Sequence, residues 1–225
     1  MRPIEKGINN KTFNQYQDAR GDLINRLGEY CSYCERKLPA SLAVEHVQPK
    51  SLYPGLLLEW DNFLLACPSC NSAKGDADVQ LKDYILPHRD NTFLAFVYSE
   101  GGRITVNDKL DEEQKKCAQN ILALAGLQKR PRLNDSKGSD RRWRHRLEAW
   151  DTATASLDDL LKDDTEPLRK CIVRLAAANG HWSIWMTVFK DDKDMLRRFI
   201  KTFRGASEEC FDESGAPIPR KGGIV

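Results

Sequence analysis

Short apolar runs bounded by turn residues follow one another in the first half of the chain, which is typical of small strands. One amphipathic helix is expected first, over residues 12–27. Two strands are predicted next, over 41–47 and 57–66, followed by a short helix that ends near Gly75. The local order is therefore strand, strand, helix. Residues 1–10 contain Pro, Gly and Asn-Asn and are expected to form a loosely held arm.

The second half of the chain carries apolar residues at helical spacing. A hairpin over residues 92–106, turned at Glu100-Gly101-Gly102, precedes it. Helices are then predicted over residues 110–127, 139–161, 166–178 and 192–203. The aromatic segment 181–189 is expected to be buried, and the glycine- and proline-containing tail 215–225 to be flexible. This pattern predicts an α+β fold with an N-terminal domain, 1–107, and a helical C-terminal region, 108–225.

Amino-acid composition says more about the cellular compartment of the protein than about its function. Charged residues make up 30% of its 225 residues, and no apolar run is long enough to cross a membrane. The first twenty residues lack the apolar core of a secretory signal. We therefore expect a cytoplasmic protein without a membrane partner. In that compartment thiols stay reduced, so paired cysteines indicate metal ligands rather than disulfides.

Four of the seven cysteines form two Cys-x2-Cys pairs, which is the strongest chemical signal in the chain. The pairs are Cys31 with Cys34 and Cys67 with Cys70. Four thiolates at this spacing predict a tetrahedral Zn²⁺ site, and since all four ligands come from the protein, the zinc is structural and leaves no position for substrate. The other three cysteines are scattered over helical segments and are expected to be inert thiols.

Polar residues between and after the two cysteine pairs supply candidate catalytic groups. His46 is the candidate general base, because a neutral imidazole can accept a proton from an attacking water near pH 7. Glu45 beside it and Asn71 beside the last cysteine are candidate ligands for a catalytic divalent ion. Adjacent strand residues face opposite sides, so Glu45 and His46 can share a site only if the strand is twisted or bulged there. The alternatives are a structural histidine at 46 and a helix cap at 71.

Two further residues in this region have both a functional and a structural interpretation. Asn62 follows Trp60-Asp61 and could orient the His46 ring, brace the loop between the strands or simply form a turn. Lys74 lies three residues after Asn71 and could contact a substrate phosphate or be a solvated surface lysine.

A basic segment lies in the second half of a chain whose net charge is only +2. Residues 129–146 contain eight Lys or Arg and two Asp, so this segment carries +6. Its densest part places four arginines around Trp143, namely Arg141, Arg142, Arg144 and Arg146. Such a cluster could follow a nucleic-acid backbone, dock an acidic partner surface, or be a solvated helix face with Trp143 as a core anchor.

The run CSYC…AVEHVQPKSL…LEWDNFLLACPSCNSAKGD resembles the HNH endonucleases that carry a four-cysteine zinc site around a ββα-metal fold. His46 matches the first motif histidine and Asn62 the central asparagine. Asn71 stands at the third position, where the family also has His, which makes this an HNN variant. The resemblance implies that His46 is the base, that Glu45 and Asn71 hold Mg²⁺ or Mn²⁺, and that Asn62 supports them.

The segments YQDARGDLINRLGEYCSYCERKLP and LPHRDNTFLAFVYSEGGRITVN extend the likeness to the PtuB-type HNH nucleases of the Septu antiphage systems. That resemblance implies a nucleic-acid substrate, DNA in preference to RNA, and an ATPase partner of the PtuA type. In retron versions of these systems a reverse transcriptase with its msDNA is added. Two other functions stay open: a zinc-containing binding module that breaks no bond, and a stand-alone restriction or homing-type HNH nuclease.

Overall fold

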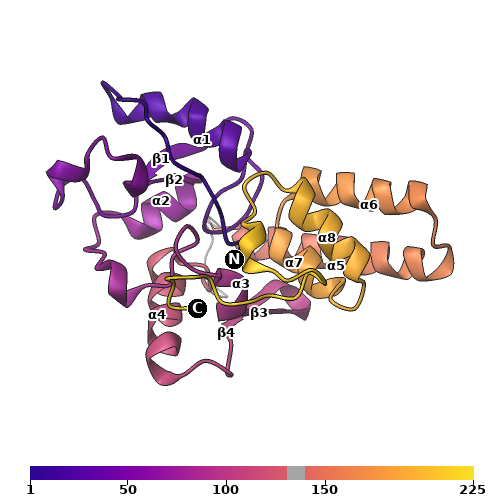
Figure 1. Cartoon of the computed structure of the whole chain (residues 1–225). Coiled ribbons are helices and arrows are strands. Elements are labelled where there is room, and N and C mark those ends of the chain that lie inside the picture. The colour runs from indigo at the N-terminus through magenta and orange to yellow at the C-terminus, as the bar shows by residue number, and fades with distance from the viewer. Residues whose placement is uncertain (131–139) are drawn as a thin grey trace.

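The computed structural model describes residues 1–130 and 140–225, and its N-terminal part contains a small ββα unit (Figure 1). Strands β1 (Ala43–His46) and β2 (Phe63–Ala66) pair antiparallel, with Glu45 opposite Leu64 and His46 opposite Phe63. Helix α2 (Pro68–Lys74) follows β2 directly and ends at Gly75, as predicted. The α+β class and the ββα unit are therefore confirmed.

A helix and the N-terminal arm cover this unit. Helix α1 (Ala19–Leu27) follows a 3-10 turn at Tyr16–Asp18 and ends at Gly28, whose φ of 74° continues the chain out of the helix. The expectation of a loosely held arm is wrong. Lys6, only 6% exposed, donates hydrogen bonds to the carbonyls of Trp60, Asp61 and Phe63, so the arm is fastened to the start of β2.

A second small sheet lies between the ββα unit and the C-terminal helices. Strands β3 (Phe96–Ser99) and β4 (Arg103–Val106) form the expected hairpin, but the predicted first strand begins too early, because Thr92–Ala95 form the short helix α3. Gly102 closes the hairpin turn at φ +63°. A Cβ there would lie 2.4 Å from the main-chain nitrogen of Leu147, so only glycine permits the contact with the following long helix.

Five α-helices follow in the part of the C-terminal half that the structure describes, and four of them lie close to their predicted positions. They are α4 (Glu112–Leu124), α5 (Arg142–Lys162), α6 (Glu166–Asn179), α7 (Trp182–Val188) and α8 (Lys193–Thr202). The start predicted for α5 at Ser139, like Arg132 and Lys137 of the basic segment, lies outside the described residues. Helices α5 to α8 gather at the end of the molecule opposite α1, β1 and α2 (Figure 1).

The aromatic segment and the tail both pack into the interior. Trp182 and Trp185 of α7 are fully buried, which confirms that the segment is part of the core. The expectation of a flexible tail is wrong for a related reason. The Val225 carbonyl accepts a hydrogen bond from the Asn91 main chain at 2.9 Å, and Arg220 donates to the Ile4 carbonyl at 2.9 Å. The tail thus fastens the two ends of the chain to each other.

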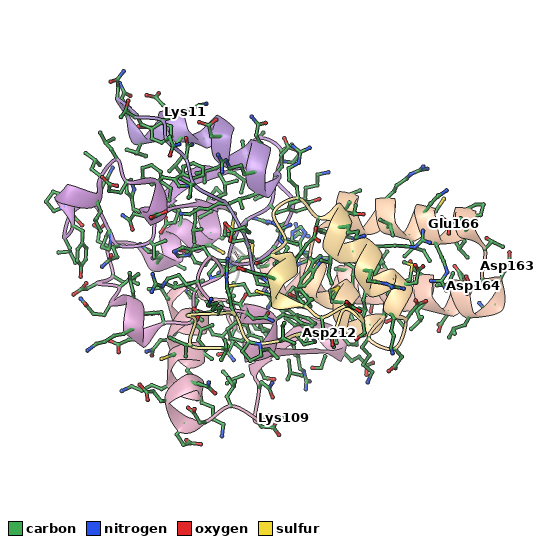
Figure 2. The ribbon with its side chains drawn as sticks, viewed as in Figure 1. Lys11, Lys109, Asp163, Asp164, Glu166 and Asp212 are labelled. Carbon is green, nitrogen blue, oxygen red and sulfur yellow. The ribbon has the colours of Figure 1, made fainter. Side chains whose placement is uncertain are left out.

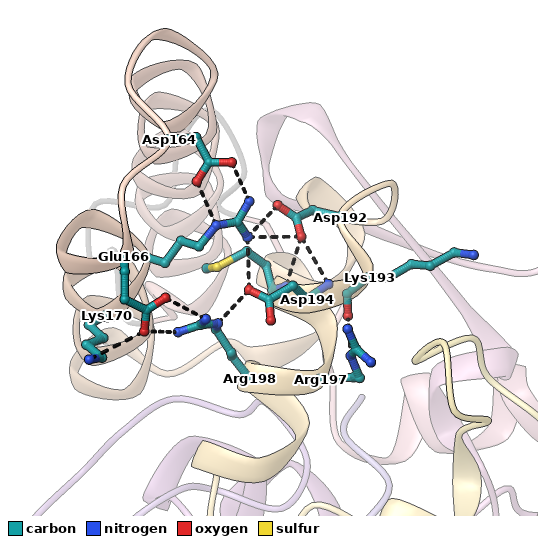
Figure 3. Close-up of polar contacts among 10 residues, drawn as sticks. Asp164, Glu166, Lys170, Asp192, Lys193, Asp194, Arg197 and Arg198 are labelled. Carbon is teal, nitrogen blue, oxygen red and sulfur yellow. Dashed lines mark hydrogen bonds and ion pairs between the residues drawn. The ribbon is translucent and has the colours of Figure 1, made fainter.

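Charged side chains connect the N-terminal parts of α6 and α8 (Figure 3). Arg169 pairs with Asp164 at 2.7 Å and with Asp192 at 2.9 Å, while Arg198 pairs with Glu166 at 2.7 Å. Figure 2 shows Asp164 and Glu166 at the tip of the α5–α6 pair, away from the ββα unit. Because most of these groups face solvent, the network supports local helix packing and adds little to overall stability.

One continuous hydrophobic core takes residues from both halves of the chain. The halves are also joined by hydrogen bonds at the first cysteine pair. The buried carboxylate of Glu35 accepts bonds from the main-chain nitrogen of Ser183 at 3.0 Å and from its hydroxyl at 2.5 Å. The division at residue 107 stays a prediction, and the C-terminal helices hold the zinc-site segment in place.

Candidate active site

The four predicted zinc ligands meet in the interior. Their sulfur atoms all lie within 4.8 Å of one another, and the Sγ atoms of Cys34 and Cys67 are 3.7 Å apart. A tetrahedral zinc with Zn–S bonds of about 2.3 Å needs sulfurs about 3.8 Å apart, so the donor set fits the ion. Main-chain N–H groups of Cys67 and Cys70 point to the sulfurs of Cys31 and Cys67, which stabilises thiolates.

Arg142 serves this zinc site and does not face solvent. Its side chain, 3% exposed, donates to the sulfur of Cys70 at 3.0 Å and to the carbonyls of Ala125 and Gly126 at 2.6 and 2.9 Å. It also forms an ion pair with Asp140. The hypothesis that Arg142 contacts nucleic acid is therefore corrected, because every donor it carries is already engaged inside the protein.

The same correction applies to Arg146, one helical turn further along α5. It is 4% exposed and donates to the carbonyls of Gly102 and Leu127 at 3.0 and 2.8 Å. Arg141 and Arg144 are exposed, and Arg144 forms a surface pair with Glu148 at 3.1 Å. Only these two of the four arginines remain available to a partner or to nucleic acid.

His46 is held at the end of β1 with one ring nitrogen occupied. Its Nε2 lies 3.0 Å from the carbonyl oxygen of Leu57. A carbonyl can only accept a hydrogen bond, so Nε2 carries the proton and the lone pair of the neutral ring is on Nδ1. Edge-on contacts with Tyr16 and Phe63, at centroid distances of 4.8 and 5.2 Å, fix the plane of the ring.

The surroundings of His46 keep its ring neutral. Burial lowers the pKa of His46 most, and the positive charges of Lys50 and Lys74 lower it further, while the bond to Leu57 acts in the opposite direction. At neutral pH the imidazole is therefore uncharged. A neutral ring with a free Nδ1 is the form that can accept a proton.

Asn62 braces the loop between the strands and does not touch the His46 ring. Its Oδ1 accepts from the main-chain nitrogen of Gln48 at 2.8 Å, and its Nδ2 donates to the carbonyls of Gln48 and Leu56 at 3.0 and 3.4 Å. The next residue, Leu57, supplies the carbonyl that holds His46, so Asn62 and His46 are connected through this loop. Of the three interpretations of Asn62, loop bracing agrees with these contacts.

Glu45 is buried beside a lysine. The Nζ of Lys74 lies 2.9 Å from Oε1 of Glu45, with both side chains below 5% exposed. The expectation that Lys74 is free to contact substrate is therefore wrong in this structure. Among the described residues Oε1 accepts no regular hydrogen bond, so the ion pair with Lys74 is the polar contact it makes. Burial raises the pKa of Glu45, and the charge of Lys74 opposes that shift.

Glu45 and Asn71 approach the same region from different elements. Asn71 and Lys74 are three residues apart on α2 and lie on the same side of that helix, and Lys74 contacts Glu45 of β1. The helix-cap interpretation of Asn71 is wrong, because Cys67 is the N-cap of α2. The pairing of β1 with β2 is regular through His46, so the bulge considered for this strand is absent from the described ladder, and only the twist of β1 remains to bring the adjacent Glu45 and His46 to one site. A carboxylate and a carboxamide are oxygen donors that a hard divalent ion prefers, but in this structure the Lys74 ammonium occupies the Oε1 position of Glu45.

Residues 31–77, which contain both cysteine pairs, His46, Asn62 and Asn71, match the family described as HNH endonuclease. The matched segment runs from the first cysteine pair to just past the end of α2. The chain is also similar to the Septu protein PtuB of Bacillus thuringiensis, with 37% identity over 71 residues. That match covers 30% of this chain and 28% of the PtuB chain.

Three features of the HNH site were not foreseen from the sequence. The Leu57 carbonyl holds the base, Tyr16 borders it, and Lys50 places a positive charge near it. A main-chain carbonyl has no sequence signal, but a lysine and an aromatic residue near the motif could have been considered. Among the helices of the described residues, none has both the length and the apolar character that a membrane crossing requires.

Proposed function

We propose that this protein is a metal-dependent HNH endonuclease that hydrolyses nucleic-acid phosphodiesters. The observation that carries the proposal is the fixed tautomer of His46 inside the matched HNH segment. With Nε2 bonded to the Leu57 carbonyl, Nδ1 is the atom that takes the proton from water as the water attacks phosphorus. After the transfer both ring nitrogens carry protons, and the Leu57 carbonyl stabilises the imidazolium.

Glu45 and Asn71 are the residues that would hold Mg²⁺ or Mn²⁺. A divalent ion at this position supplies positive charge for the leaving oxygen and the scissile phosphate. Glu45 would contribute a buried carboxylate, and the Lys74 ammonium that now pairs with it would have to move aside for the divalent ion. The zinc on the four cysteines has only a structural role, because its donor set is complete.

The nucleic-acid surface is proposed to include the exposed Arg141 and Arg144, with DNA preferred to RNA. The similarity to Septu protein PtuB supports an effector nuclease that works with an ATPase of the PtuA type. A retron version would add a reverse transcriptase with its msDNA. The ATPase gene next to this one, if it is present, is the partner to co-express.

The test is cleavage of supercoiled plasmid and of a structured RNA with Mg²⁺ or Mn²⁺, compared with EDTA. We expect metal-dependent cutting by the wild type and a loss of cutting in His46→Ala, with zinc content and unfolding midpoint unchanged. His145→Ala is the matched control, because His145 is partly exposed on α5 outside the site. Cutting by His46→Ala at the wild-type rate would eliminate the proposed mechanism.

The outcomes also separate the other functions. A binding module would shift labelled nucleic acid in a gel and cut nothing, with or without the ATPase. A stand-alone nuclease would cut without the partner. An effector of the PtuB type would need the ATPase, or release by it, to reach its full rate.

A further inference from the structure

We propose that Lys50, seated on the ring of Tyr16, binds the substrate phosphate that neighbours the scissile one. This inference rests on the proposed nuclease function and adds a substrate contact to it. It assigns to Lys50 the role that the sequence suggested for Lys74.

The Tyr16 ring lies between the Lys50 ammonium and His46 and contacts both. Its Nζ lies 4.6 Å from the centroid of the Tyr16 ring and 3.4 Å from the Tyr16 hydroxyl. The same ring meets His46 edge-on at 4.8 Å. A cation over an aromatic face is attracted by the ring and loses part of its freedom, so the ammonium is held near His46 before substrate binds.

Lys50 is also available for substrate, unlike the other cation near His46. Lys74 is buried and paired with Glu45, whereas Lys50 is exposed and takes part in no ion pair among residues 1–130 and 140–225. An exposed ammonium without a carboxylate partner gains a phosphate contact at little desolvation cost. Lys50 therefore combines accessibility with a fixed position next to the base.

The loop that carries Lys50 is anchored on both sides of it. Asn62 holds the main chain of Gln48, and the Leu57 carbonyl holds His46. The carbonyl of Pro49 accepts from the nitrogens of Leu52 and Tyr53 at 3.0 and 2.9 Å, which closes a turn around Lys50. A phosphate bound by Lys50 would thus be held in register with Nδ1 of His46.

The test compares Lys50→Met with Lys201→Met, which removes the same charge from an exposed position on α8. Binding of a fluorescein-labelled DNA duplex is measured against KCl concentration in the His46→Ala background, and plasmid cleavage is measured with His46 intact. For Lys50→Met we expect the slope of log Kd against log [KCl] to fall by about 0.9, the value for one phosphate contact. We also expect KM to rise about tenfold. Lys201→Met should leave both unchanged.

Two more variants separate contact from packing. Lys50→Arg should retain the salt slope, because the charge remains. Tyr16→Leu, which removes the ring face that holds the ammonium, should raise KM in the direction of Lys50→Met. If the wild type binds and cuts while Lys50→Met matches Lys201→Met in slope and KM, the inference is overturned. If the wild type neither binds nor cuts, both alone and with the ATPase, the proposed nuclease function fails, and the role proposed for Lys50 fails with it.

Discussion

Replacing Arg142 by Met should unfold the region around the zinc site, although Arg142 lies in a cluster that looks like a nucleic-acid contact. The side chain is 3% exposed and supplies hydrogen bonds to the Cys70 sulfur and to two main-chain carbonyls. Methionine fills a similar volume but donates nothing. Three buried acceptors and the Asp140 carboxylate would lose their partner.

The magnitude follows from the burial of these groups. Breaking a buried, hydrogen-bonded charge pair by removing one partner costs about 3–5 kcal/mol. Loss of an outer hydrogen bond to a metal ligand weakens metal affinity about 10–100-fold. We therefore expect Arg142→Met to lower the free energy of unfolding by about 4 kcal/mol. We also expect zinc to be released to a chelator at a lower concentration. Urea unfolding in the presence of zinc and competition with a chromogenic chelator measure the two effects.

Arg144→Met is the matched control two residues away. Its surface pair with Glu148 is worth about 0.3–0.5 kcal/mol, so this variant should unfold and hold zinc almost as the wild type does. Arg142→Lys, which keeps the charge but reaches fewer acceptors, should fall between the two. If Arg142→Met matched Arg144→Met in unfolding free energy and zinc affinity, the structural role assigned to Arg142 would be refuted.

Two further predictions concern stability. Cys67→Ser should lose zinc and cooperative folding together, since binding of a structural zinc contributes folding free energy; atomic absorption and circular dichroism would record both, and a folded, zinc-free variant would contradict this. Burial lowers the pKa of His181 to about 3. Because the unfolded chain binds this proton near pH 6.5, stability should fall as the pH drops from 6.5 toward 3, by about 2 kcal/mol at pH 5. In His181→Asn, which tolerates the left-handed backbone at φ 54°, urea midpoints should depend less on pH, and an unchanged dependence would count against burial of the neutral ring.

The local parts of the fold could be predicted from the sequence because their signals are local. Cysteine spacing determines which thiols can share an ion, and the turn at Gly75 ends α2 within a few residues of its ligands. The N-terminal arm and the tail could not be predicted in this way. Lys6 finds its acceptors in the Trp60–Phe63 segment, and Arg220 finds its acceptor at Ile4. A segment rich in glycine, proline and polar residues is flexible only if it forms no hydrogen bonds with residues far away in the sequence.

The arginine cluster shows a different kind of error. The buried positions of α5 recur at alternating steps of four and three residues: Arg142, Arg146, Ala149, Ala153, Ser156 and Leu160. Arg141 and Arg144 fall between these steps and are exposed. The spacing of buried positions along α5 therefore distinguishes the buried Arg142 and Arg146 from the exposed Arg141 and Arg144. It was missed because arginine is rarely buried, and an inward arginine needs acceptors that only the tertiary structure reveals.

The two HNH motif residues His46 and Asn62 are connected through the loop between their strands. Asn62 closes the loop at Gln48, and the loop then presents the Leu57 carbonyl to Nε2 of His46. Loss of the Asn62 carboxamide would free that carbonyl, and either ring nitrogen could then carry the proton. The ring would stay in place through its contacts with Tyr16 and Phe63, but Nδ1 would no longer be fixed as the base. In the proposed mechanism Asn62 would therefore determine which nitrogen of His46 accepts the proton from water.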